Sequence, residues 1–128
     1  MILEDVISFL KRVPPFQFLE EPVLAELAGS ISLEFYPSDT LILRQDGPPS
    51  EFLRIIKKGG VKVSMDTNDG GEVVIDYRGE GDNFGFLSLV GKDKVRANVR
   101  AIDDTICYLI PKETMTRLMD AHPILTEY

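Results

Sequence analysis

Apolar residues follow two different periods along the chain, and the period changes after the second predicted helix. In residues 2–13 they recur at helical spacing and form one side of a predicted amphipathic helix, which Pro14 and Pro15 would end. A second helix is predicted over residues 21–28, with a proline suited to its first turn and Gly29 suited to its end. We expect both helices to pack their apolar sides on the domain or on a second copy of the chain.

Residues 31–111 contain short segments rich in β-branched and aromatic residues, separated by turn-forming residues. Their spacing is typical of an antiparallel sandwich or barrel. The predicted strands cover residues 32–36, 40–44, 51–57, 60–65, 72–78, 95–101 and 105–111. We therefore expect a fold that is mainly β, with helices before and after the strands.

Helical spacing returns at the end of the chain. Residues 111–119 are predicted to form a helix with Met115, Leu118 and Met119 on its apolar side. His122 precedes a proline and would begin a further helix, which stops within about two turns. Because that helix stops in mid-pattern, we expect the sequence to be the amino-terminal part of a longer protein.

The length and composition suit one domain over residues 1–128. With 128 residues, of which 44% are hydrophobic, the chain can bury one core. This domain divides into amino-terminal helices over residues 1–30, a β region over residues 31–111 and carboxyl-terminal helices over residues 112–128.

The charge of the chain argues against two classes of partner. The net charge is −7, from 14 basic and 21 acidic residues, and the basic residues do not cluster. Nucleic acid and anionic membranes are therefore poor partners for this surface. The sequence also lacks an apolar window of about 20 residues and a signal peptide, so we expect a cytoplasmic protein.

Few residues suggest catalysis or metal binding. Cys107 lies alone in an apolar run, which favours a buried structural thiol, and His122 has no second metal-ligating residue at suitable spacing. Residues 66–72 favour a hairpin turn over a calcium loop, because the ligand spacing is wrong. Asp103 and Asp104 are predicted to form a solvated turn. No catalytic motif is recognisable, so we do not expect an enzyme.

Residues 78–101, RGEGDNFGFLSLVGKDKVRANVRA, are the best candidate for a ligand site. They predict a tight turn ending at Gly85, a single helical turn over residues 86–90, a charged loop and a final β segment. A glycine directly before a short helix lets backbone N–H groups face a small anion. We therefore predict that any small ligand binds here.

In order and spacing this stretch resembles the phosphate-binding cassette of cyclic-nucleotide-binding domains, F-G-E-L-A-L, five residues, then R-[AS]-x-x-V-[RK]-A. The chain matches that pattern at Phe84, Gly85, Leu87, Leu89, Val99, Arg100 and Ala101. The resemblance implies an antiparallel jelly roll and a ligand such as cAMP, cGMP or another small phosphate compound. The ligand-binding residues that it implies are Gly85, Phe86, Leu87, Ser88, Val95, Arg96, Ala97 and Asn98.

Both side chains that the family uses for recognition differ in this sequence. The glutamate that binds the ribose hydroxyl is replaced by Phe86, and the arginine that pairs with the cyclic phosphate is replaced by Val95. Arg96 lies one residue later, so in an extended strand it would point away from the pocket unless a bulge intervened. Losing two charge-assisted hydrogen bonds would weaken a nucleotide by about 3–6 kcal/mol, which is roughly 10²- to 10⁴-fold.

Two predicted turns support the same resemblance, in residues 36–43 and 45–52. Asp39 stands where the family commonly has glycine, and Asp46 with Gly47 stands where it commonly has Gly-Asp. Aspartate tolerates left-handed conformations better than most residues, so both differences are compatible with the turns.

Over nearly its whole length the chain most resembles the amino-terminal domain of bacterial signalling proteins that continue into CBS domains and a predicted nucleotidyltransferase. That resemblance implies a regulatory sensor domain whose partners are the downstream domains of the same chain. Two alternatives stay open: a ligand-free module for interaction or homodimerisation, with Phe86 and Val95 filling the pocket, and the sensor domain of a catabolite-activator-type transcription regulator.

Overall fold

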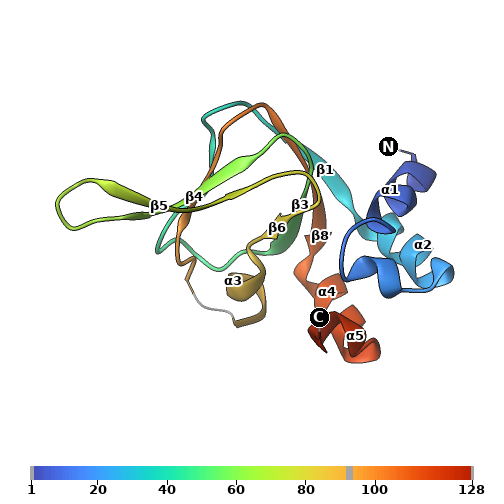
Figure 1. The fold of residues 1–128 in the computed structure, drawn as a ribbon. Coiled ribbons are helices and arrows are strands. Elements are labelled where there is room, and N and C mark those ends of the chain that lie inside the picture. The colour runs from blue at the N-terminus through green and yellow to red at the C-terminus, as the bar shows by residue number, and fades with distance from the viewer. Residues whose placement is uncertain (1, 92–93, 128) are drawn as a thin grey trace.

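The computed structural model describes residues 2–91 and 94–127 of the chain. Within these residues, eight strands form two antiparallel four-stranded sheets (Figure 1). The first sheet has the order β1 (Ser32–Tyr36), β8 (Thr105–Pro111), β3 (Phe52–Lys58) and β6 (Asn83–Phe84). The second has the order β2 (Leu41–Leu43), β7 (Asn98–Ala101), β4 (Val61–Asp66) and β5 (Glu72–Arg78). The predicted mainly β jelly roll is confirmed.

Helices flank the roll on one side. The helices before it are α1 (Leu3–Leu10), the short 3-10 helix η1 (Phe16–Phe18) and α2 (Glu21–Ser30), and those after it are α4 (Lys112–Ala121) and α5 (Ile124–Glu127). Helix α3 (Phe86–Gly91) lies between β6 and β7 in the chain. Figure 1 shows the β4–β5 hairpin projecting away from the side that carries α1 and α2. None of the described helices is long and apolar enough to cross a membrane.

Strand β8 is buried on both faces and joins the two parts of the core. Cys107 and Leu109 pack inside the roll, whereas Tyr108 and Ile110 pack with the apolar sides of the helices. This alternation explains the continuous apolar run in the sequence, because successive side chains of a strand point to opposite faces. Each buried side chain contributes roughly 1.5–3 kcal/mol, so the helices and the roll stabilise each other.

The two unusual aspartates adopt the conformations that the sequence suggested. Asp39 has a φ of 75° and Asp46 a φ of 64°, both in the left-handed region. The backbone N–H of Asp46 donates to the carbonyl of Val95 at 2.7 Å, which ties this turn to the segment before β7. The expectation that aspartate is compatible with these turns is therefore confirmed.

The strand predicted over residues 95–101 is shorter than expected, and β6 was not predicted at all. Strand β7 begins at Asn98, because Val95 exchanges backbone hydrogen bonds with the turn at Asp46 and Gly47. Strand β6 has only two residues and lies in the glycine-rich stretch, where no alternating pattern can develop. It forms because Asn83 and Phe84 pair with β3.

The ends of α1 and α2 differ from the prediction. Helix α1 ends at Leu10, and the next residues continue as a turn before the prolines. Gly29 does not end α2, which continues to Ser30, whose hydroxyl donates to the carbonyl of Leu27. His122 lies between two helices. Its N–H donates to the carbonyl of Leu118 at 2.8 Å and so ends α4, and its carbonyl accepts from the N–H of Leu125 at 3.0 Å in the turn that leads into α5.

Candidate functional site

A cavity of about 170 Å³ lies at the predicted cassette, between the start of α3 and the segment before β7. Its walls come from both sheets and from the segments that join them. The residues that line it are Leu43, Val63, Arg78, Asn83, Phe84, Gly85, Phe86, Ser88, Val95, Arg96, Ala97 and Val99. Six of the eight predicted ligand-binding residues are thus brought together around one cavity.

Gly85 sets the direction of α3. It has a φ of 88°, in the left-handed region that favours glycine. A Cβ atom at this position would meet neighbouring atoms at 3.4 Å or more, so the backbone conformation and not lack of space requires glycine. The N–H of Leu89 donates to the carbonyl of Gly85 at 3.1 Å, which closes the first turn of α3.

Ser88 and Asn98 have structural roles. The N–H of Ser50 donates to the hydroxyl of Ser88 at 2.7 Å, which ties α3 to the loop before β3. The side-chain oxygen of Asn98 accepts from the N–H of Gln45 at 2.8 Å, and its amide nitrogen donates to Asp66 at 3.0 Å. These bonds shape the walls of the cavity, although Asn98 does not line it.

Val95 forms an apolar wall where the family pattern has its arginine. Only 6% of its surface is exposed. Its N–H donates to the carbonyl of Gly47 at 3.1 Å, and its own carbonyl accepts from Asp46, so both backbone groups are fixed. The cavity therefore lacks a positive charge at the position of residue 95.

Arg96 lies at the rim of the same cavity. It is exposed and lines the cavity, and it has no hydrogen-bond or ion-pair partner among the described residues. The expectation that it would point away assumed a strand beginning at Val95, but residues 94–97 are not part of a strand. Strict alternation of side chains therefore does not apply to Arg96.

Arg78, which the sequence analysis did not single out, is a second guanidinium at the cavity. Its Nη1 donates to the carbonyl of Asn83 at 2.9 Å, and its Nε pairs with the carboxylate of Asp76 at 3.1 Å. These bonds hold the side chain between the end of β5 and β6. The only signal in the sequence was its position directly before the glycine-rich turn.

Phe86 forms a wall of the cavity and does not fill it. Its side chain is partly buried, packs against the helical part of the core, and also lines a second cavity of about 200 Å³. Met115 and Leu125, from the carboxyl-terminal helices, line that second cavity too. Phe86 therefore lies between the candidate ligand cavity and helices α4 and α5. The side chain of Leu87 lies outside the described residues.

Other parts of the described structure offer less chemistry. Cys107 is fully buried, and burial raises the pKa of its thiol to about 12. Residues 66–72 form the predicted hairpin turn between β4 and β5. Among the described residues, no group of three or more His, Cys, Asp and Glu side chains could hold a metal ion.

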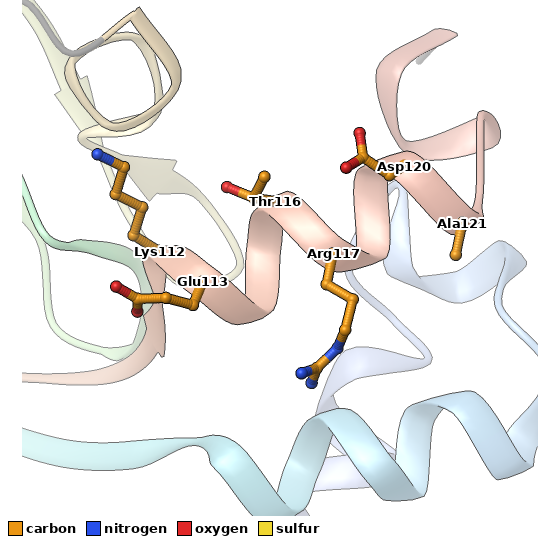
Figure 2. A pocket seen from close by; sticks show the side chains of 6 residues that line it. All are labelled: Lys112, Glu113, Thr116, Arg117, Asp120 and Ala121. Carbon is orange, nitrogen blue, oxygen red and sulfur yellow. The ribbon is translucent and has the colours of Figure 1, made fainter.

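An open groove of about 760 Å³ runs along α4 (Figure 2). Its lining residues are Lys112, Glu113, Thr116, Arg117, Asp120 and Ala121. Figure 2 shows Arg117 pointing toward α2, and its Nη2 lies 4.0 Å from the carboxylate of Glu26. Thr116 and Asp120 point to the other side of α4. Because these side chains point in different directions, they do not form a common binding site for a small ligand.

Comparisons with known proteins agree with this geometry. The family described as the cyclic nucleotide-binding domain matches residues 33–122. The cGMP-dependent protein kinase, isozyme 1, of Drosophila melanogaster is 31% identical over 120 residues, which cover 91% of this chain and 16% of the kinase.

Two solved structures have closely similar folds. One is the regulatory subunit of a cAMP-independent protein kinase A from Trypanosoma cruzi bound to guanosine, with a TM-score of 0.85, 25% identity, and coverage of 97% of this chain and 43% of that chain. The other is the corresponding subunit from Trypanosoma brucei, a triple mutant bound to cAMP, with a TM-score of 0.84, 23% identity, and coverage of 98% and 44%. The chain thus spans less than half of each of these relatives. Since the family match covers well over half of the sequence, the chain belongs to the cyclic nucleotide-binding domain family.

Proposed function

We propose that this chain is the sensor domain of a bacterial signalling protein, and that a nucleoside or cyclic nucleotide binds in the cavity beside Gly85. The observation that carries the proposal is the open cavity of about 170 Å³ at the cassette position. The named ligands of the two trypanosomal relatives, guanosine and cAMP, support this ligand class. In this proposal Gly85 and the first amides of α3 face the ligand, and Phe86, Ala97 and Val95 form its apolar walls.

The size of the cavity implies that the ligand is only partly enclosed. Drug-sized ligands usually occupy pockets of about 300–1,000 Å³, and this cavity is smaller. One end of a nucleoside, the ribose with or without its phosphate, would enter the cavity, and the base would lie toward solvent. We therefore expect weak binding, with a dissociation constant in the high micromolar to millimolar range.

The charges at the cavity favour a ligand whose phosphate is not essential for binding. Val95 gives no charge, and Arg78 already pairs with Asp76 and Asn83. Arg96 is the side chain with the capacity to bind a phosphate at the rim. One charge-assisted hydrogen bond contributes about 1.5–3 kcal/mol. A phosphate bonded to Arg96 would therefore increase the affinity of a nucleotide, and a nucleoside without the phosphate would still bind.

The proposed output lies in downstream domains of the same chain. We propose that the chain is the amino-terminal domain of a protein that continues into CBS domains and a predicted nucleotidyltransferase, and that it has no catalytic role itself. Phe86 supports a route for the signal, because it borders the ligand cavity on one side and a cavity lined by Met115 and Leu125 on the other. A ligand that moves Phe86 would change the packing of α4 and α5.

The test is a calorimetric and thermal titration of the 128-residue chain with guanosine, cAMP, cGMP, cyclic dinucleotides and inorganic phosphate. At about ten times its dissociation constant, a ligand stabilises the folded state by about 1.4 kcal/mol, which is a measurable rise in melting temperature. Arg96→Ala should weaken cAMP about tenfold or more and leave guanosine unchanged. The control is Arg117→Ala, an exposed arginine on α4 that does not line the cavity. The proposal fails if no compound changes the melting temperature at about 10 mM.

A ligand-free interaction module is the second candidate function. It is favoured by the replacement of both recognition residues with apolar side chains, Phe86 and Val95. This candidate predicts that titration gives no heat with any nucleotide. The third alternative, the sensor of a catabolite-activator-type regulator, would be distinguished by a helix-turn-helix in the sequence that follows residue 128.

A further inference from the structure

A second hollow, the β2–β3 hollow, lies next to the ligand cavity. It is open, has a volume of about 280 Å³ and is formed by β2, the loop after it and the first residues of β3. Leu43 and Val95 line both the ligand cavity and this hollow, so they form the boundary between the two. The charged residues that line the β2–β3 hollow are Arg44, Glu51 and Arg54.

Arg54 is a half-buried arginine that forms none of the ion pairs in the described part of the chain. Its Nε donates to the hydroxyl of Tyr36 at 2.8 Å, and its Nη1 donates to the hydroxyl of Ser50 at 3.3 Å. Both acceptors are neutral, and burial raises the pKa of the Tyr36 phenol. A partly buried charge without an opposite charge is unfavourable, so this guanidinium favours an anion beside it.

The contacts of Arg54 also hold its side chain in place. Its guanidinium carbon lies 5.7 Å from the centroid of the Phe52 ring. Ser50 is fixed in turn, because its hydroxyl donates to the carbonyl of Phe52 at 2.7 Å. The Nη2 group of Arg54 has no hydrogen-bond partner among the described residues and is not sealed from solvent. The protein therefore presents this donor group in a fixed orientation at the hollow.

Arg44 provides a second guanidinium at the β2–β3 hollow. Its side chain is exposed, and it has no hydrogen-bond or ion-pair partner within residues 2–91 and 94–127. The loop after it contributes few backbone donors. Its two prolines lack an N–H group, and the N–H groups of Gly47 and Ser50 already donate to protein acceptors. The two arginines are therefore the groups that would bind an anion here.

We propose that Arg44 and Arg54 form an anion site that binds the phosphate group of a small phosphorylated metabolite. A phosphate monoester carries nearly two negative charges at neutral pH, which two guanidinium groups match in charge and geometry. The net charge of the chain, −7, repels anions in general, so phosphate binding requires a specific site. This site goes beyond the proposed function and does not depend on the binding of a nucleotide.

Glu51 reduces the affinity of this site for phosphate. It is exposed, lines the hollow and forms no ion pair with either arginine in the described structure. One carboxylate beside two guanidinium groups leaves the hollow with a net positive charge. Glu51→Gln should therefore tighten phosphate binding about two- to fivefold, as expected when one exposed like charge is removed.

The test is a thermal and calorimetric titration of the 128-residue chain with inorganic phosphate at about pH 7.5, with sodium chloride holding the ionic strength constant. We expect a dissociation constant of about 1 mM and a rise in melting temperature of about 5 °C at about 10 mM phosphate. Acetate, which carries one charge, should bind at least about tenfold more weakly.

Two variants measure the contribution of the arginines. Arg44→Ala changes an exposed side chain, so the variant should fold, and its dissociation constant for phosphate should rise about tenfold or more. Arg54→Gln should weaken phosphate by a similar factor. Circular dichroism shows whether this second variant is folded.

The controls are Arg96→Ala and Arg117→Ala, which remove one positive charge at the ligand cavity and on α4. Neither should change the affinity for phosphate. The proposal is overturned if phosphate has no more effect than chloride, if acetate binds as tightly as phosphate, if Arg44→Ala binds phosphate as the native chain does, or if Arg96→Ala abolishes the binding. Titration with guanosine, which has no phosphate, tests the proposed function separately.

Discussion

Moving the arginine of the cassette back by one residue should strengthen the binding of a cyclic nucleotide to this chain. The change is the double substitution Val95→Arg with Arg96→Ala, which restores the dipeptide of the family pattern. Val95 lines the cavity, and its backbone is held by hydrogen bonds to Asp46 and Gly47. A side chain introduced at this position therefore projects from a fixed backbone beside the cavity.

The expected gain follows from one new charge-assisted hydrogen bond. Such a bond contributes about 1.5–3 kcal/mol. The double variant should therefore bind cAMP about 10- to 150-fold more tightly than Arg96→Ala does. The substitution also places a charge where only 6% of the native side chain is exposed. The ligand-free variant should therefore lose about 1–3 kcal/mol of stability, part of which cAMP restores.

Isothermal titration with cAMP measures the gain, with the native chain and Arg96→Ala as references. The single variant separates the loss of Arg96 from the addition of the new arginine. Circular dichroism and the melting temperature show whether each variant is folded. If the folded double variant binds cAMP no more tightly than Arg96→Ala does, the cavity does not hold the cyclic phosphate, and our assignment of the site is refuted.

Three further predictions concern the roll that supports the cavity. Gly59→Ala should lower the free energy of unfolding, measured in urea, by several kcal/mol more than Gly70→Ala does. Both glycines have a positive φ, but only at Gly59 would a Cβ lie 2.6 Å from backbone and side-chain atoms. Equal losses of stability in the two variants would contradict this contact. Thr105→Val should lower the free energy of unfolding by about 1–3 kcal/mol in the same assay, because the variant leaves the N–H of Gly60 unpaired. In the native chain this N–H donates to the buried hydroxyl of Thr105 at 3.2 Å. An unchanged free energy of unfolding would show that the N–H finds another acceptor. Cys107 should not react with a thiol reagent at pH 8 until the chain unfolds. Burial raises the pKa of its thiol to about 12 in the folded state, above the unfolded value. The protonated thiol should therefore contribute fully to the free energy of unfolding below about pH 8.5, and this contribution should fall as the pH rises toward 12. Rapid labelling of the folded chain would contradict its burial.

The periodicity of the sequence was sufficient to predict most of the fold, because the core is built from regular strands and helices. Strands β1, β5 and β8 begin and end at the predicted residues. Local conformational preference was equally informative at Asp39 and Asp46, where few residue types tolerate a positive φ. In these places the sequence and the tertiary contacts favour the same local structure.

The candidate site was harder to predict, because its walls come from segments without regular structure. The strand expected from Val95 is replaced by contacts with the turn at Asp46 and Gly47, which lie about fifty positions earlier in the chain. The inference that Arg96 points away depended on that strand. Arg78 was missed because its position at the cavity depends on how β5 packs beside β6. Such long-range contacts leave no local pattern in one sequence.

The residues that line the cavity can be observed individually by NMR. The central claim is that a nucleoside or cyclic nucleotide binds beside Gly85, so the most direct measurement is a titration of the ¹⁵N-labelled chain with guanosine and with cAMP. The account predicts that the amide signals of Gly85, Phe86 and Arg96 shift with ligand concentration, while those of Ile75 and Arg117 do not move. Unchanged signals at Gly85, Phe86 and Arg96, or shifts confined to the α4 groove, would contradict it.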